Sequence, residues 1–147
     1  MKKLLTIACL LSVTLAATLA TNAGAQTTPT QQPAPSLDCA TATTQARMNE
    51  CAYEDFLAAT AGYAASYKTL SDRLGTAQKD QFRRTQKLWI QYHTAACNFE
   101  SSGVAGGSAQ AMVKSQCDAR MTRARTAELT ALANCKEGDL SCPHFKK

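Results

Sequence analysis

The sequence lacks the motifs that most enzymes and metalloproteins require. It has only two histidines, His93 and His144, and no pair of cysteines separated by two residues, so a zinc site of the usual spacing is not expected. It also contains no G-x-S-x-G, H-E-x-x-H, P-loop or dinucleotide-binding motif. We therefore expect a non-enzymatic protein without a metal ion or another cofactor.

The sequence also lacks patterns typical of β-strands, and it has no strong excess of charge of one sign. No alternating or β-branched run is bounded by turn residues, so no sheet is expected. Charged residues make up 18% of the chain and the net charge is +5, to which Lys2 and Lys3 contribute two. The modest excess that remains without these two favours solubility over a dedicated anion-binding role, and nucleic acid is not an expected partner.

The beginning of the chain has the order of a secretory signal peptide, which we assign to residues 1–25. A basic start at residues 1–3 precedes an uncharged run over residues 4–20, and small residues follow at 23–25. Cleavage after residue 25 would leave a protein that is not membrane-embedded and that is periplasmic or secreted. Residues 26–38 are rich in Thr, Gln, Pro and Ala, which predicts a flexible leader.

Three later stretches carry apolar residues at steps of three and four, the spacing of one helix face. They predict helices over about 44–75, over about 77–100 with Thr76 as N-cap, and over about 109–135 with Ser108 as N-cap. The predicted inward stripe of the second helix is Phe82, Thr85, Trp89, Tyr92, Ala96 and Phe99. That of the third is Val113, Cys117, Met121, Ala124, Leu129, Leu132 and Cys135.

Six cysteines follow the predicted signal peptide, and an even number in a small exported domain predicts disulfides. Cys97 and Cys117 are the favoured pair, because they would join two antiparallel helices across a short connection. The remaining cysteines are Cys39, Cys51, Cys135 and Cys142. They would pair locally within each terminal region, or alternatively between the two regions, which would close a longer loop.

These patterns together predict an all-α fold. Over residues 39–135 we expect a small, disulfide-stapled, three-helix antiparallel bundle whose first helix is long. The tail over residues 136–147 contains Gly138 and Pro143 and is predicted to be irregular and held by its cysteine.

Two surfaces are candidates for binding a partner. The Gly- and Ser-rich connection between the second and third helices would be anchored by the favoured disulfide, as in a rigid recognition loop. Its candidate target-binding residues are Glu100, Ser101, Ser102 and Ser108. The alternative surface consists of basic residues on the second and third helices, which would suit an anionic polymer. These are Arg83, Arg84, Lys87, Arg120, Arg123 and Arg125.

One ordered set of residues resembles a known family of small bacterial envelope proteins. The set comprises Met48–Cys51, Tyr67, Leu70, Gln86, Trp89, Cys97, Gly106–Ser108, Cys117, Thr122, Arg125 and Leu129. It is similar to the lysozyme inhibitor LprI N-terminal domain, and the likeness covers nearly all of the chain from Cys39 to about Leu132. The resemblance implies an exported helical domain that inhibits lysozyme.

The resulting functional hypothesis is an exported, non-enzymatic binding protein that inhibits a lysozyme or a related peptidoglycan hydrolase. The alternative is an envelope structural or stress module that binds cell-wall polymer, or itself, through the basic helix faces. Several residues of the family set are expected to be structural rather than to contact a partner. They are Tyr67, Gln86, Trp89, Thr122, Arg125 and Leu129.

Overall fold

The computed structural model describes residues 38–136 and 138–146 of the chain. The predicted signal peptide, and the predicted leader as far as residue 37, lie outside the described residues. The structure contains helices α1 (Gln45–Arg73), α2 (Thr76–Glu100) and α3 (Gln110–Ala133) and the 3₁₀-helix η1 (Ser101–Val104). The described ranges contain no strand beyond an isolated bridge between Leu74 and Phe145. The prediction of an all-α fold is confirmed.

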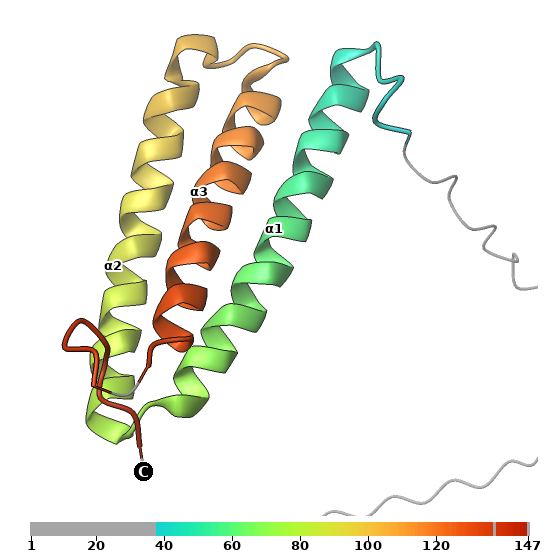
Figure 1. Ribbon diagram of the computed structural model, residues 1–147. Helices are drawn as coiled ribbons and strands as arrows, with labels where there is room; N and C mark the ends of the chain where they lie inside the picture. The colour runs from blue at the N-terminus through green and yellow to red at the C-terminus, as the bar shows by residue number, and fades with distance from the viewer. Residues whose placement is uncertain (1–37, 137, 147) are drawn as a thin grey trace, which may run out of the picture. The chain divides into compact units, whose positions relative to one another are not determined.

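The three long helices lie side by side, with α3 between α1 and α2 (Figure 1). Consecutive helices run in opposite directions, so α1 and α3 are parallel to each other. The most extensive packing is between α1 and α3, whereas α1 and α2 approach each other much less closely. Helix α2 therefore has one close neighbour, and much of its surface faces away from the bundle.

Local hydrogen bonds determine where the helices begin. At the start of α1 the hydroxyl of Thr44 accepts the backbone N–H of Arg47 at 3.3 Å, which is a standard N-cap. The predicted N-caps of the other two helices were wrong. Gly75 occupies the N-cap of α2, and α3 is preceded by Ala109 rather than Ser108, because the connecting loop ends in one further turn.

The apolar core is concentrated near the α1–α2 turn. Its buried members are Leu70, Leu74, Phe82, Leu129 and Ala133, and the partly buried side chains of Tyr63, Tyr67, Leu132 and Phe145 pack against them. Towards the other end of the bundle the buried apolar residues of α1 and α3 are mainly alanines, such as Ala52, Ala59 and Ala119. Small side chains let two helices approach closely but bury little area. This half of the bundle thus needs other sources of stability.

Three disulfides join parts of the chain, and two of them lie at the end with the smaller core. Cys97 is joined to Cys117, with the Cα atoms 5.5 Å apart, and this bond links α2 to α3 at the end with the smaller core. The other bonds are Cys39–Cys51 and Cys135–Cys142. Both are local, so the structure does not use the alternative in which a disulfide ties the first helix to the tail.

The predicted inward stripe of α2 was wrong at three positions, Thr85, Tyr92 and Phe99, which are all exposed. Tyr92 is 66% exposed and Phe99 is 82% exposed, and Ala124 of α3 is exposed too. Because α2 packs closely only on α3, its buried face is narrow. That face consists of Phe82, Gln86, His93 and Cys97.

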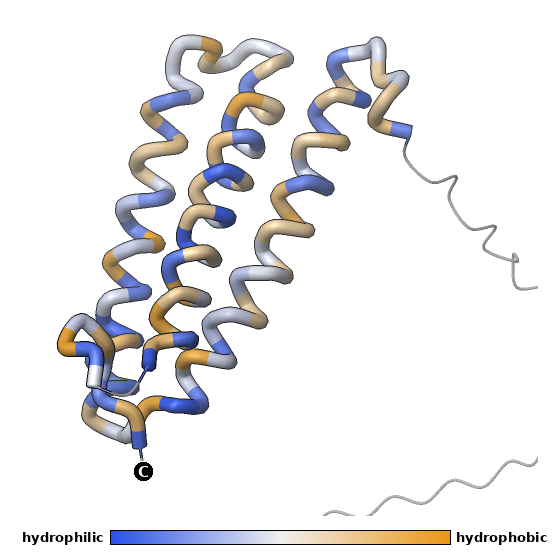
Figure 2. The backbone as a smooth tube through the Cα atoms, viewed as in Figure 1, coloured by the Kyte–Doolittle hydropathy of each residue, from blue (hydrophilic) through white to orange (hydrophobic). Residues whose placement is uncertain are grey.

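Hydrophobic and hydrophilic segments alternate along all three helices (Figure 2). Among the described residues, no helix combines the length and the apolar character needed to cross a membrane.

Candidate functional site

The α2–α3 connection lies at one end of the bundle, and a disulfide joins α2 to α3 next to it. Cys97 and Cys117 are 0% and 1% exposed, and the chain leaves α2 directly above them. The hydroxyl of Ser101 donates to the carbonyl oxygen of Cys97 at 2.8 Å, so the first residue of η1 is fixed to the last turn of α2. The start of the connection is therefore rigidly placed relative to both helices.

Backbone hydrogen bonds organise the rest of the connection. The N–H of Ala105 donates to Ser102 and that of Gly107 donates to Val104, at 3.1 and 3.0 Å. Gly106 has a φ of +75°, a conformation that a residue with a side chain adopts only with strain. Its N–H donates to the side-chain oxygen of Gln110 at 2.8 Å. The loop consequently has a defined shape of its own.

Helix α1 supports the connection from the side. The side-chain amide of Asn49 donates to the carbonyl oxygen of Ser108 at 3.0 Å. Asn49 belongs to the Met48–Cys51 segment of the family set, and this contact gives that segment a structural role. All three helices thus hold the same loop.

The outer surface of this end carries exposed apolar side chains and an ion pair. Phe99 is 82% exposed and Val104 is 36% exposed. Between them in sequence, the carboxylate of Glu100 pairs with Arg120 of α3 at 2.5 Å, with both side chains about half exposed. We define Phe99, Glu100, Ser102, Val104 and Ser108 as the loop-end site.

The structure places the four sequence-predicted contact residues differently. Glu100, Ser102 and Ser108 lie on the exposed surface, whereas Ser101 is 1% exposed and is bonded inside the loop. Ser101 therefore cannot offer its hydroxyl to a partner. Sequence reasoning missed Phe99 and Val104. The position of Phe99 next to the polar connection could have indicated that it is exposed. Its spacing, however, matched the predicted inward stripe of the helix, so it was assigned to the core.

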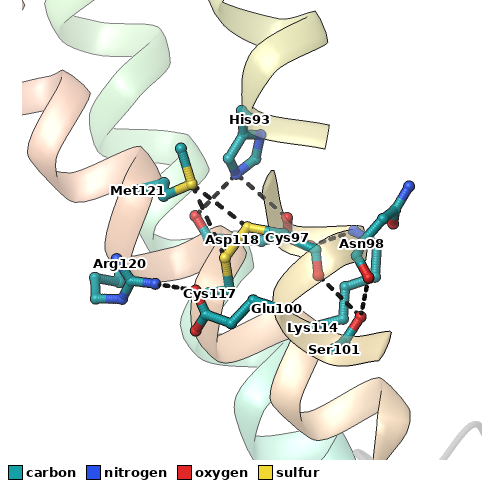
Figure 3. Close-up of a disulfide and its surroundings, with 10 residues drawn as sticks. All are labelled: His93, Cys97, Asn98, Glu100, Ser101, Lys114, Cys117, Asp118, Arg120 and Met121. Atoms are coloured by element: carbon teal, nitrogen blue, oxygen red, sulfur yellow. Dashed lines mark hydrogen bonds and ion pairs between the residues drawn. A yellow bond between two sulfur atoms is a disulfide. The ribbon is translucent and has the colours of Figure 1, made fainter. Parts of the chain in front are cut away.

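A polar network lies next to the disulfide (Figure 3). Nε2 of His93 is 3.2 Å from a carboxylate oxygen of Asp118, and the other oxygen of that carboxylate accepts from Lys114 at 2.8 Å. Trp89 stacks on the His93 ring, with centroids 4.9 Å apart. His93 is buried, and these contacts join α2 to α3.

Two groups of potential metal ligands exist in the described residues, but both depend on cysteines. One is His93, Cys97 and Asp118, and the other is Cys135, Asp139 and Cys142. In each group the cysteine sulfurs already form disulfides. Sulfur in a disulfide does not supply the thiolate that binds zinc or copper, so neither group has the chemistry of a metal site in the oxidised protein.

The family residues in the middle of the bundle pack as an aromatic cluster between α1 and α2. Trp89 stacks on Tyr63 with centroids 5.4 Å apart, and Tyr67 stacks on Phe82 at 4.9 Å. Two further residues of the family set, Thr122 and Leu129, belong to α3 and are 3% and 0% exposed. The stacked rings bridge the gap between α1 and α2, which do not approach closely.

Arg125 extends this cluster with polar contacts. Its Nε donates to the side-chain oxygen of Gln86 at 3.1 Å, and its terminal nitrogen pairs with Glu128 at 2.6 Å. The hydroxyl of Tyr63 donates to the same Gln86 oxygen at 3.3 Å, and burial raises the pKa of Tyr63 above 10.0. Arg125 therefore contacts Gln86 and Glu128 at the same time.

The basic helix faces are largely neutralised by neighbouring acids. Arg83 pairs with Asp80, Arg120 with Glu100, Arg123 with Asp55 and Arg125 with Glu128. A guanidinium that already faces a carboxylate attracts an anionic polymer less strongly. This arrangement weakens the alternative hypothesis of polymer binding through these faces.

The Asp55–Arg123 pair links α1 to α3 and should titrate at low pH. The hydrogen bond from Arg123 lowers the pKa of Asp55 below 3.8. The pair therefore stabilises the fold fully above the pKa that Asp has in the unfolded chain, and the contribution is lost as the pH falls through the lower, folded-state pKa. We expect an NMR titration of the Asp55 carboxyl to give a pKa below 3.8, and the variant Arg123→Gln to raise it. An unchanged pKa in Arg123→Gln would contradict the assignment.

These features define the protein as a small, disulfide-bonded, all-α domain with a rigid, exposed loop end. The chain belongs to the LprI family: a family model described as lysozyme inhibitor LprI matches residues 38–129. An uncharacterised protein of Rhizobium meliloti (strain 1021) is 32% identical over 120 residues, which covers 73% of this chain and 85% of that protein. No solved structure matches the chain.

Proposed function

We propose that this protein is an exported, non-enzymatic inhibitor that binds a lysozyme or a related peptidoglycan hydrolase through the loop-end site. The family match supports the class of target. The signal-peptide pattern over residues 1–25 supports a periplasmic or secreted location.

The observation that carries the choice of site is an exposed apolar tip on a rigid support. Phe99 and Val104 are exposed while the backbone around them is held by the Cys97–Cys117 bond and by hydrogen bonds from two helices. A preorganised loop loses little conformational entropy on binding, so more of its contact energy contributes to affinity. Such a loop suits insertion into an open cleft like that of a glycan hydrolase.

Electrostatics are compatible with a basic target. Long-range steering would not favour the encounter of two positively charged proteins. At the loop end, however, the Glu100–Arg120 pair leaves no local excess of positive charge, and the remaining contact groups are apolar or hydroxyl-bearing. We therefore expect inhibition to depend only weakly on salt, unlike binding of an anionic polymer through arginines.

The first experiment is a lysozyme turbidity assay with the purified, oxidised protein against several lysozyme types. Dose-dependent inhibition that is lost after reduction would support the proposal, because reduction removes the bond beneath the loop. If the folded, helical protein inhibits none of the enzymes, the proposal is wrong.

The variant Val104→Asp tests the site itself. We expect it to raise the inhibition constant at least about tenfold, equivalent to about 1.4 kcal/mol, because a carboxylate would have to be desolvated in the cleft. The matched control is Leu140→Asp, since Leu140 is 101% exposed and lies in the tail. Equal inhibition by the wild type and Val104→Asp would exclude the loop-end site even if the protein inhibits.

A further inference from the structure

The disulfide between α2 and α3 lies within a cluster of side chains that can each bind a metal ion (Figure 3). A ring nitrogen of His93, the sulfur of Cys97 and a carboxylate oxygen of Asp118 all lie within 4.8 Å of one another. Cys117 is bonded to Cys97 and brings a second sulfur to the same place. None of the four residues is more than 9% exposed. We call His93, Cys97, Cys117 and Asp118 the α2–α3 ligand set.

The polar half of the set already has the spacing of two ligands on one ion. Nε2 of His93 and a carboxylate oxygen of Asp118 are 3.2 Å apart, and a nitrogen and an oxygen on one tetrahedral zinc ion lie about 3.4 Å apart. The other oxygen of Asp118 accepts from Lys114 at 2.8 Å, and the ring of His93 stacks on Trp89. Contacts of this kind orient the ligands of metal sites, so both side chains are placed before an ion binds.

The sulfur half of the set is available only when the disulfide is open. Two thiolates on one tetrahedral zinc ion lie about 3.8 Å apart. Side-chain rotation can reach this separation, because the Cα atoms of Cys97 and Cys117 are 5.5 Å apart. The sulfur of Met121 lies 3.5 Å from that of Cys97 and 3.9 Å from that of Cys117. The unbranched Met121 side chain adapts its shape easily, so it can yield the space that an ion needs.

We propose that the α2–α3 ligand set binds one zinc ion when the Cys97–Cys117 bond is open. Two thiolates, one imidazole and one carboxylate are all common zinc ligands, and four of them complete a tetrahedron. On binding, the two thiols lose their protons, and His93 binds through Nε2 as the neutral ring with its proton on Nδ1. The three negative ligands, the doubly charged ion and the ammonium of Lys114 sum to zero, so the occupied site would bury no net charge.

Zinc and the disulfide exclude each other at this place. The chain passes through the dithiol form before the bond is made, and in that form the ion would join α2 to α3 next to the loop-end site. An external disulfide then takes two electrons from the thiolates and becomes two thiols, the Cys97–Cys117 bond forms, and the zinc ion leaves. An excess of a thiol reductant reverses these steps. Zinc binding does not depend on the proposed inhibition.

Titration with cobalt(II), which gives visible absorption bands in a tetrahedral thiolate site, tests the zinc site without any target. The protein used is a variant with four substitutions, which remove the other two disulfides and the second group of ligands in the tail. They are Cys39→Ser, Cys51→Ser, Cys135→Ser and Cys142→Ser. With an excess of a phosphine reductant and without oxygen, we expect this two-cysteine variant to bind one cobalt ion. Zinc should displace the cobalt with a dissociation constant below about 1 µM, and the oxidised form should bind neither ion.

The histidine ligand is tested in the same two-cysteine variant. His93→Phe keeps an aromatic ring against Trp89 but removes the nitrogen, so it should weaken cobalt binding at least about tenfold and change the visible bands. The matched control is His144→Phe, at the other histidine of the chain, which lies exposed in the tail. It should leave both the affinity and the spectrum unchanged. Far-UV circular dichroism compares the helix content of all these proteins.

Three results would overturn the inference. A reduced two-cysteine variant that is helical but gives no tetrahedral cobalt spectrum would exclude the site, and equal affinities of His93→Phe and His144→Phe would exclude the histidine ligand. Equal binding by the oxidised form would exclude the need for an open disulfide. If the two-cysteine variant is not helical, the reduced wild type is compared with the double variant Cys97→Ser, Cys117→Ser. Equal numbers of bound cobalt ions in these two proteins would then exclude the site.

Discussion

Replacement of both Cys97 and Cys117 by alanine is expected to lower the free energy of unfolding by about 3 kcal/mol or more. The sequence separation of the pair is 20 residues, and opening a loop of that size restores about 3 kcal/mol of unfolded-state entropy in the chain-entropy model. A further loss is expected because both sulfurs are buried and their removal leaves a cavity. Urea denaturation of the wild type and the double variant measures the difference.

The matched comparison is the removal of the Cys135–Cys142 bond. This bond closes a separation of only 7 residues, so its loss should cost about 2 kcal/mol. The structure adds a spatial distinction. Hydrogen exchange in the variant without Cys97–Cys117 should accelerate mainly in η1 and the adjoining helix ends, because that half of the bundle has the smaller core. Equal destabilisation by both double variants would contradict this explanation.

Trp89→Ala is expected to destabilise the bundle by about 3 kcal/mol, towards the lower end for a large aromatic because Trp89 is partly exposed. The substitution removes the ring that stacks on Tyr63 and His93. It also removes a contact with Arg125, whose guanidinium carbon lies 5.9 Å from the Trp89 ring centroid. The aromatic cluster joins α1 to α2, which have few direct contacts, so the loss of Trp89 removes one of the main links between them.

Thermal unfolding followed by circular dichroism measures this effect, since the chain contains one tryptophan and the variant has no tryptophan fluorescence. Tyr92→Ala is the control, because Tyr92 is an aromatic residue of the same helix but is 66% exposed. It should change the stability of the monomer by less than about 0.5 kcal/mol. A comparable loss in the two variants would mean that Trp89 has no special structural role.

The local elements of this fold were predictable because they depend on neighbouring residues. Periodic apolar residues indicated three helices, and the end of α1 near Gly75 follows from turn chemistry within a few positions. The errors arose where a distant contact matters. Ser108 does not cap α3, because its carbonyl is held by Asn49 from α1 and the loop adds one more turn before the helix.

The candidate site was only partly predictable for the same reason. The polar composition of the connection indicated an exposed loop, and Glu100 and Ser102 are indeed exposed. The burial of Ser101 depends on a bond to the preceding turn of α2, and a serine in a Gly-rich segment gives no sign of such a bond. The exposure of Phe99 depends on which side of α2 lacks a neighbour.

The sequence by itself determined the helical class, the approximate helix lengths and the family, because periodicity and ordered motifs are properties of the chain. Only the tertiary structure decided which face of each helix is buried. Three amphipathic helices can be arranged in several ways, and an apolar stripe does not specify its neighbour. Since α3 lies between α1 and α2, half of the predicted inward stripe of α2 is left exposed, and Phe99 thereby joins the surface of the loop-end site.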